Sequence, residues 1–190
     1  MTPSLVLAST SPRRRDLLAR LGVVPDRVIG PHIDESPLKG EIPRVYALRL
    51  AEQKAHAVER AEGEVVVAGD TTVACGRMIL PPAETEDIQR TLLKRLSGRR
   101  HHVLSAVCVI DAEGKLRTRL ADSIVTFKPL TDAEIEAYIA CGEGLGKAGG
   151  YAIQGRAEAW VRYLAGSHSG VIGLPLFETR ALLVAAGVLT

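Results

Sequence analysis

Apolar positions along the chain recur with two different spacings, and these spacings predict an alternation of strands and helices. Short apolar runs over residues 5–8 and 65–68 are typical of strands that are buried on both faces. Between them, apolar residues three and four positions apart follow Pro43 and predict a helix that ends near Gly63. We therefore expect an α/β protein in which helices pack against a sheet.

Local signals at the ends of elements place the remaining helices and strands. Ser11 followed by Pro12 predicts a helix start, and Thr131 with Glu134 forms the pattern of a capping box. Residues 111–114 separate two long β runs and predict a hairpin turn. The further expected elements are helices over 12–22, 84–96, 131–142 and 175–186, strands over 102–110, 116–127 and 158–164, loop and irregular strand over 23–41, and a loop over 142–155.

Composition narrows the class of protein. With 46% hydrophobic and 24% charged residues and a formal net charge of +2, the chain has the composition of a globular protein rather than a disordered one. No composition shift or linker divides it, so we expect a single domain over residues 1–190 with a mixed twisted sheet and flanking helices. The composition does not decide whether a cleft splits this sheet into two lobes.

Several classes of function are disfavoured. No apolar run approaches the roughly 20 residues that span a bilayer, and no secretory signal is evident, so we expect a cytoplasmic protein that does not bind membranes. The small net charge and few aromatic rings disfavour binding of nucleic acid. The three cysteines lack zinc-site spacing and cannot all pair. The oligomeric state stays open, a homodimer included.

Three consecutive arginines lie just inside the expected first helix. The helix dipole already supplies about half a positive charge there, and each added cation costs roughly 0.3–1 kcal/mol, so an anionic ligand would offset them. The hydroxyls of Ser9 and Ser11 and the free backbone N–H groups would bind a phosphate. Arg13 or Arg14 would add charge to that site. The alternative is a solvated basic turn paired with Asp16.

Asp70 follows the second apolar run, and Gly69 beside it indicates the C-terminal end of a buried strand. Open α/β sheets place ligand-binding groups at that end. Asp70 is therefore a candidate ligand for Mg²⁺ or a general base toward water, and an Asx turn or helix N-cap is the alternative. Asp34 and Glu35 offer further oxygen ligands, although residue type alone favours a plain surface loop for this segment.

Two further segments carry candidate binding groups. Lys54 lies at the border of the apolar face of its expected helix, where a lysine extending along apolar surface toward solvent is ordinary and a substrate contact is the alternative. The segment 146–155 combines glycines with the cation Lys147 and with Gln154, whose amide can read the edge of a base; a flexible connector is the alternative. Together these signals indicate a phosphorylated small molecule, a divalent metal and a hydrolytic carboxylate.

The chain resembles the Maf nucleotide pyrophosphatases in a series of short segments that occur in the family's order. The matching residues are 7–14, 34–35, 50–51, 54–55, 69–73, 96–101, 147–155 and 173–176. The resemblance implies one Maf-like domain over residues 1–190, with two lobes around a central cleft as in inosine triphosphatase-like enzymes. It also implies hydrolysis of nucleoside triphosphates to the monophosphate and pyrophosphate. Residues 151–155 resemble the branch that acts on dTTP and UTP, with modified pyrimidine nucleotides as further candidates.

The resemblance also implies roles for single residues. Asp70 matches the family's proton acceptor, and with Glu35 it would bind Mg²⁺ or Mn²⁺. The residues on phosphate- and metal-handling positions are Ser9, Arg13, Glu35 and Lys54. The residues on positions linked to substrate choice are Arg13, Thr71 and Gln154. We expect Ser11 and Lys147 to contribute to substrate binding as well.

One position departs from the family pattern. The family usually carries a lysine where this chain has Pro82, so one phosphate contact is missing unless Arg77 or Lys147 replaces it. A charged hydrogen bond is worth about 1.5–3 kcal/mol, and we therefore expect catalysis that is slower by roughly ten- to a hundredfold without being abolished. The alternative is a nucleotide-binding regulatory protein with weak or no turnover.

Overall fold

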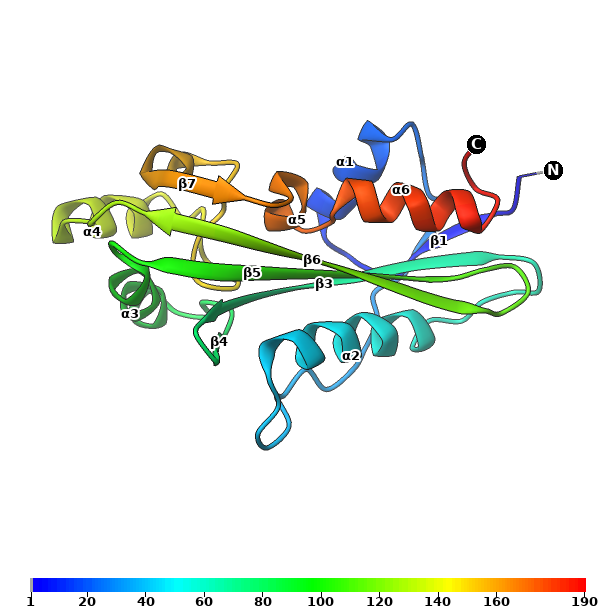
Figure 1. Cartoon of the computed structure of the whole chain (residues 1–190), viewed down its shortest axis with the longest axis horizontal. Helices are drawn as coiled ribbons and strands as arrows, with labels where there is room; N and C mark the ends of the chain where they lie inside the picture. Colours follow the sequence, from blue (N-terminus) through cyan, green and yellow to red (C-terminus); the bar gives the residue numbers. More distant parts are fainter. Residues whose placement is uncertain (1) are drawn as a thin grey trace.

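The computed structural model describes residues 2–190, and these form one seven-stranded sheet with helices on both faces (Figure 1). The strands are β1 (Leu5–Leu7), β2 (Arg27–Val28), β3 (Val65–Cys75), β4 (Met78–Leu80), β5 (Arg100–Ile110), β6 (Leu116–Phe127) and β7 (Val161–Ala165). Their order is β2-β1-β3-β5-β6-β7, and β4 pairs with β3 outside this path. Because β1 is parallel to β2 and β3 whereas the other pairs are antiparallel, the sheet is mixed, as predicted.

The predicted helices are confirmed, with shifts of at most two residues at their ends except at the C-terminal end of the second helix. The helices are α1 (Pro12–Arg20), α2 (Pro43–His56), α3 (Glu86–Leu96), α4 (Asp132–Ala140), α5 (His168–Ile172) and α6 (Leu176–Ala185), with a 3-10 turn, η1 (Arg156–Trp160). α2 ends at His56 rather than near Gly63, and η1 occupies the first part of the strand that was expected over 158–164. The short elements β4 and α5 were not predicted, whereas β2 falls in the stretch where loop and irregular strand were expected. In the part of the chain described, no helix has the length and apolar character needed to span a bilayer.

The two faces of β3 contact different helices. Val65 and Val67 belong to a core cluster that includes leucines of α1 and α6. Val66 and Ala68 belong to a second cluster that includes the alanines of α2. Figure 1 shows the result, with α2 on one face of the sheet and α1 and α6 on the other. Successive β3 side chains therefore point toward different layers, as the two-residue period of a strand requires.

One edge of β3 changes its partner halfway along the strand. β1 pairs with β3 as far as Val67, and β4 pairs with it from Val73 onward. On the opposite edge, β5 pairs with β3 without interruption from Val66 to Ala74. The prediction that the strand ends at Gly69 is therefore wrong, because pairing with β5 carries β3 straight through the polar residues. Asp70 lies in the middle of a strand whose one edge is open.

Candidate active site

A cleft lies at this open edge of β3, and two connected hollows form it. The inner hollow reaches Asp70, Thr71 and Gln154, and the outer hollow reaches Ser9 and His32. Residues of α1, α2 and the loop after α4 line both hollows. The candidate residues brought together here are Ser9, Ser11, Arg13, Glu35, Lys54, Asp70, Thr71, Lys147 and Gln154. The fold thus gathers this set around one cleft. Asp34, the other candidate oxygen ligand, lines a separate hollow, and its Oδ1 accepts a hydrogen bond from the Ser36 N–H.

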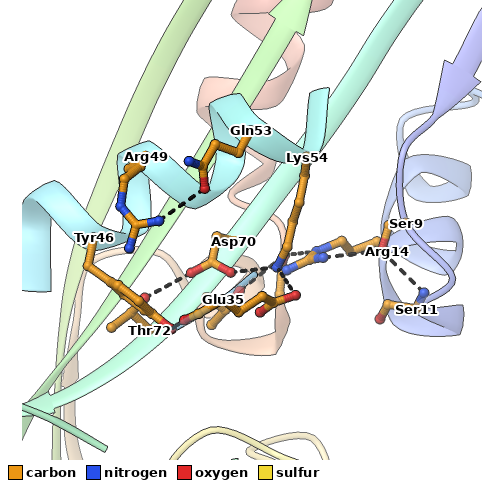
Figure 2. A network of polar contacts seen from close by, with 12 residues as sticks. Ser9, Ser11, Arg14, Glu35, Tyr46, Arg49, Gln53, Lys54, Asp70 and Thr72 are labelled. Carbon is orange, nitrogen blue, oxygen red and sulfur yellow. Dashed lines mark hydrogen bonds and ion pairs between the residues drawn. The ribbon is translucent and has the colours of Figure 1, made fainter. Parts of the chain in front are cut away.

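Lys54 and Asp70 form the buried centre of the cleft. Lys54 Nζ donates a hydrogen bond to Asp70 Oδ1 over 2.9 Å and forms an ion pair with Glu35 Oε1 at 3.0 Å (Figure 2). The side chain of Lys54 is only 9% exposed and that of Asp70 only 7%, so the interpretation of Lys54 as a solvent-directed lysine is wrong. Thr72 Oγ1 donates to Asp70 Oδ2 over 2.8 Å. Both oxygens of Asp70 are therefore held, which fixes the plane of the carboxylate.

The loop that carries Glu35 is fastened to α2. Tyr46 Oη donates to the Glu35 carbonyl oxygen over 2.7 Å, and Arg49 binds Glu41 at 2.7 Å and the Ser36 carbonyl oxygen at 3.1 Å. Burial, together with the nearby charges of Asp70 and Glu35, raises the pKa of Tyr46 to about 12, so its hydroxyl remains a donor at neutral pH. These contacts bring Glu35 to the cleft although it lies in an irregular segment.

The opposite face of β3 carries a second set of contacts. Thr71 Oγ1 donates to the Gly173 carbonyl oxygen over 3.4 Å, and Arg14 Nε donates to the same oxygen over 2.9 Å. Arg14 Nη1 also donates to Ser9 Oγ over 3.1 Å. Burial lowers the pKa of the Arg14 guanidinium, and the charge of Asp70 opposes that shift. Because β3 has an open edge here, groups from both of its faces reach the same cleft.

The sequence left the choice between the first two arginines open, and the structure gives them different surroundings. Arg14 is tied to Ser9 and Gly173, whereas Arg13 lines both hollows and has no ion-pair partner among residues 2–190. Arg14 thus connects the start of α1 to the end of α5, a contact that nothing in its local sequence indicates. Ser11 occupies the N-cap position of α1 as predicted, but its side chain makes no capping hydrogen bond. Its backbone N–H donates to Ser9 Oγ over 3.2 Å.

Pro82 lies beside Lys147 rather than beside Arg77. Pro82 forms an isolated antiparallel bridge with Ala148, and Pro82 and Lys147 both line the inner hollow. Arg77 lines a separate hollow together with His102 and Asp122. Burial lowers the pKa of Lys147, and the charge of Arg13 lowers it further. Of the two cations considered as replacements for the missing lysine, only Lys147 is at the cleft.

The donor set suits a divalent cation that is completed by substrate. No cluster of three or more histidine, cysteine or acidic side chains that could hold a metal occurs in residues 2–190. Glu35 and Asp70 nevertheless approach the same Lys54 nitrogen, so their carboxylates lie close together. Mg²⁺ commonly takes one or two carboxylates and completes its shell with phosphate oxygens and water. Two carboxylates in a cleft lined by cations fit that pattern.

Known proteins match this chain over nearly its whole length. A family model described as "Maf-like protein" matches residues 4–186. A dTTP/UTP pyrophosphatase of Sphingopyxis alaskensis is 66% identical over 187 residues, which cover 98% of each chain. A dTTP/UTP pyrophosphatase of Novosphingobium aromaticivorans is 61% identical over 187 residues. That match covers 98% of this chain and 93% of the relative.

Among solved structures, this chain is similar to the nucleoside-triphosphatase / dITP/XTP pyrophosphatase of Mycobacterium abscessus. The TM-score is 0.43 at 20% identity, and the match covers 67% of this chain and 75% of that one. The family match and the two relatives cover the segments that line the cleft, from the start of α1 to the loop after α4. This chain belongs to the Maf family.

Proposed function

We propose that this protein hydrolyses dTTP and UTP to their monophosphates and pyrophosphate. The relatives named above carry this activity in their names, at 66% and 61% identity over almost the whole chain. The observation in the structure that supports it best is Asp70, a buried carboxylate held by Lys54 and Thr72 in a cleft lined by further cations. A carboxylate in such surroundings can take a proton from water beside a polyanion.

The phosphate chain would bind across the inner and outer hollows. Arg13 and Lys147 lie close enough for the charge of one to lower the pKa of the other, so an anion between them would relieve their repulsion. The start of α1 adds backbone N–H groups and the positive end of the helix dipole. Ser9 and Lys54 also line the outer hollow. These groups together suit a triphosphate better than a single phosphate.

Asp70 would act as the general base. It accepts a proton from water, the water oxygen bonds to the α-phosphorus, and the bond from that phosphorus to the bridging oxygen breaks, so pyrophosphate leaves. A divalent cation, Mg²⁺ or Mn²⁺, held by Glu35 and Asp70 would neutralise charge on the phosphate oxygens. Lys54 holds the two carboxylates in place and stabilises negative charge on the substrate.

Gln154 would select the base. It is exposed, and the Gly155 N–H donates to the Ala152 carbonyl oxygen over 3.1 Å to close the turn that carries it. Its amide offers one donor and one acceptor group, which match the carbonyl and N–H edge that thymine and uracil share. Thr71 and Arg13 line the same inner hollow and would contact the nucleotide beside it.

Lys147 would supply the charge that the family lysine supplies elsewhere. We expect Lys147→Met to raise KM for dTTP by about tenfold, because a charged hydrogen bond to phosphate is lost. Lys115→Met is the matched control, since Lys115 is exposed in the turn between β5 and β6. Steady-state kinetics on both variants measure the effect, and equal KM values would contradict this role. No observation favours the alternative of a regulatory protein without turnover.

A panel of nucleoside triphosphates tests the proposed function. With Mg²⁺ present, we expect pyrophosphate release from dTTP and UTP to exceed that from dCTP, GTP and ATP by about tenfold or more. Preference for a purine nucleotide, or no release from any nucleotide, would overturn the proposal. We also expect the protein to hydrolyse free nucleotides in the cytoplasm and not to act on nucleic acid. A homodimer is a further expectation.

A further inference from the structure

Three successive residues just before Gln154 are each held by a buried side chain from a different element. The hydrogen bonds are Gln89 Nε2 to the Gly150 carbonyl oxygen (3.0 Å), His101 Nε2 with Tyr151 Oη (2.8 Å), and the Ala152 N–H to Tyr138 Oη (3.0 Å). We call Gln89, His101 and Tyr138 the loop anchor. They come from α3, β5 and α4, and none of them lines the cleft.

The loop anchor is embedded in a rigid part of the core. Its side chains belong to residues that are at most 2% exposed. His101 and Phe127 pack edge to face with ring centres 5.1 Å apart, and Tyr138 and Trp160 pack with centres 4.7 Å apart. Burial lowers the pKa of His101 to about 4, so at neutral pH its ring contributes a hydrogen bond and no charge. Buried polar groups cost free energy unless they are paired. Gln89 Nε2, His101 Nε2 and Tyr138 Oη each pair with this loop, whereas His101 Nδ1 has no hydrogen-bond partner among the described residues.

The anchored loop also packs against β3, at Val73, two residues after Thr71. Gly149 has φ +71°, and a Cβ at this position would lie 2.9 Å from Val73 Cγ1, so only glycine fits there without displacement. Gln154 follows two residues after the last anchored position, in the turn that the Ala152 carbonyl closes. Residues 150–152 are thus held within four positions of Gln154, which lines the same inner hollow as Thr71.

We propose that the loop anchor is a set of positioning residues that fixes Gln154 and thereby sets the discrimination between nucleotide bases. This inference rests on the proposed function of the cleft. Asp70 and Lys54 belong to β3 and α2, so they keep their positions when the loop anchor is weakened. The hydrogen bonds to the correct base weaken when the amide that makes them shifts, whereas the chemical step does not depend on them.

Two variants remove one anchoring group each and preserve side-chain size. Tyr138→Phe deletes the hydroxyl that accepts from Ala152, and Gln89→Met deletes the amide that donates to Gly150. We expect each variant to raise KM for dTTP and UTP by roughly fivefold and to keep kcat within about twofold. The ratio of kcat/KM for dTTP over dCTP is expected to fall by roughly fivefold, since the bonds that discriminate are the ones that weaken.

Tyr163→Phe on β7 is the matched control, because Tyr163 is 58% exposed and lies outside the loop anchor. We expect it to leave KM, kcat and the dTTP/dCTP ratio unchanged, and thermal melting confirms that all variants fold. If Tyr138→Phe and Gln89→Met fold but keep the wild-type ratio of kcat/KM for dTTP over dCTP, this inference is overturned and the proposed function is unaffected. A wild-type protein that hydrolyses neither dTTP nor UTP would overturn the proposed function and the inference with it.

Discussion

Replacement of Asp70 by asparagine is expected to lower kcat for dTTP hydrolysis by about a thousandfold while nucleotide binding is retained. Asparagine has nearly the shape of aspartate and can remain beside Lys54 and Thr72, but its amide cannot take a proton from water. Pyrophosphate release measures kcat, and titration calorimetry with dTTP measures binding.

Asp122→Asn is the matched control for this variant. Asp122 lies on β6, where it pairs with His102 at 2.7 Å and is 39% exposed, and it lies outside the cleft. We expect its kcat to equal that of the wild type. Undiminished turnover in Asp70→Asn would remove Asp70 from the mechanism, and loss of both binding and turnover would indicate a structural role instead.

Lys54→Met is expected to lower kcat/KM for dTTP by on the order of a hundredfold. The variant is also expected to lose about 3 kcal/mol of unfolding free energy at pH 7, because removing one partner leaves the buried Asp70 carboxylate without its counter-ion. Glu35 loses the same partner and with it an ion pair of 3.0 Å. Kinetics with dTTP and urea denaturation measure the two effects separately.

Lys94→Met provides the comparison on an exposed pair. Lys94 is 54% exposed and pairs with Asp132 at 3.1 Å, so its removal is expected to change the unfolding free energy by less than about 1 kcal/mol and to leave kcat/KM unaltered. If Lys54→Met were as stable and as active as Lys94→Met, the Lys54 ion pairs would have no role in folding or in turnover.

The strand that was predicted to end at Gly69 continues to Cys75, and local sequence pattern does not reveal this continuation. The apolar run over residues 65–68 identifies a buried strand, because both faces of that half are covered by helices. Polarity begins at Gly69 because one edge of β3 opens to the cleft, although the strand continues. Its continuation depends on pairing with β5, a distant segment that the spacing of apolar residues within residues 65–75 does not identify.

The site residues also differ in how far local sequence indicates their contacts. Ser11 and Pro12 mark the start of α1 correctly, since capping signals are local. The contact of Arg14 with Gly173 joins residues 159 positions apart and follows only from the folded chain. Lys54 resembles a solvent-directed lysine on its own helix, and only the approach of Asp70 and Glu35 makes it part of the site. The family resemblance located these positions, whereas the folded chain shows how they contact one another.

The products of dTTP turnover in the presence of Mg²⁺ test the proposed reaction most directly. Phosphorus NMR of the reaction mixture distinguishes cleavage at the α–β bond from cleavage at the β–γ bond. We predict dTMP and pyrophosphate in equal amounts. The appearance of dTDP with orthophosphate, or a mixture that still contains only dTTP, would contradict hydrolysis at the α-phosphorus.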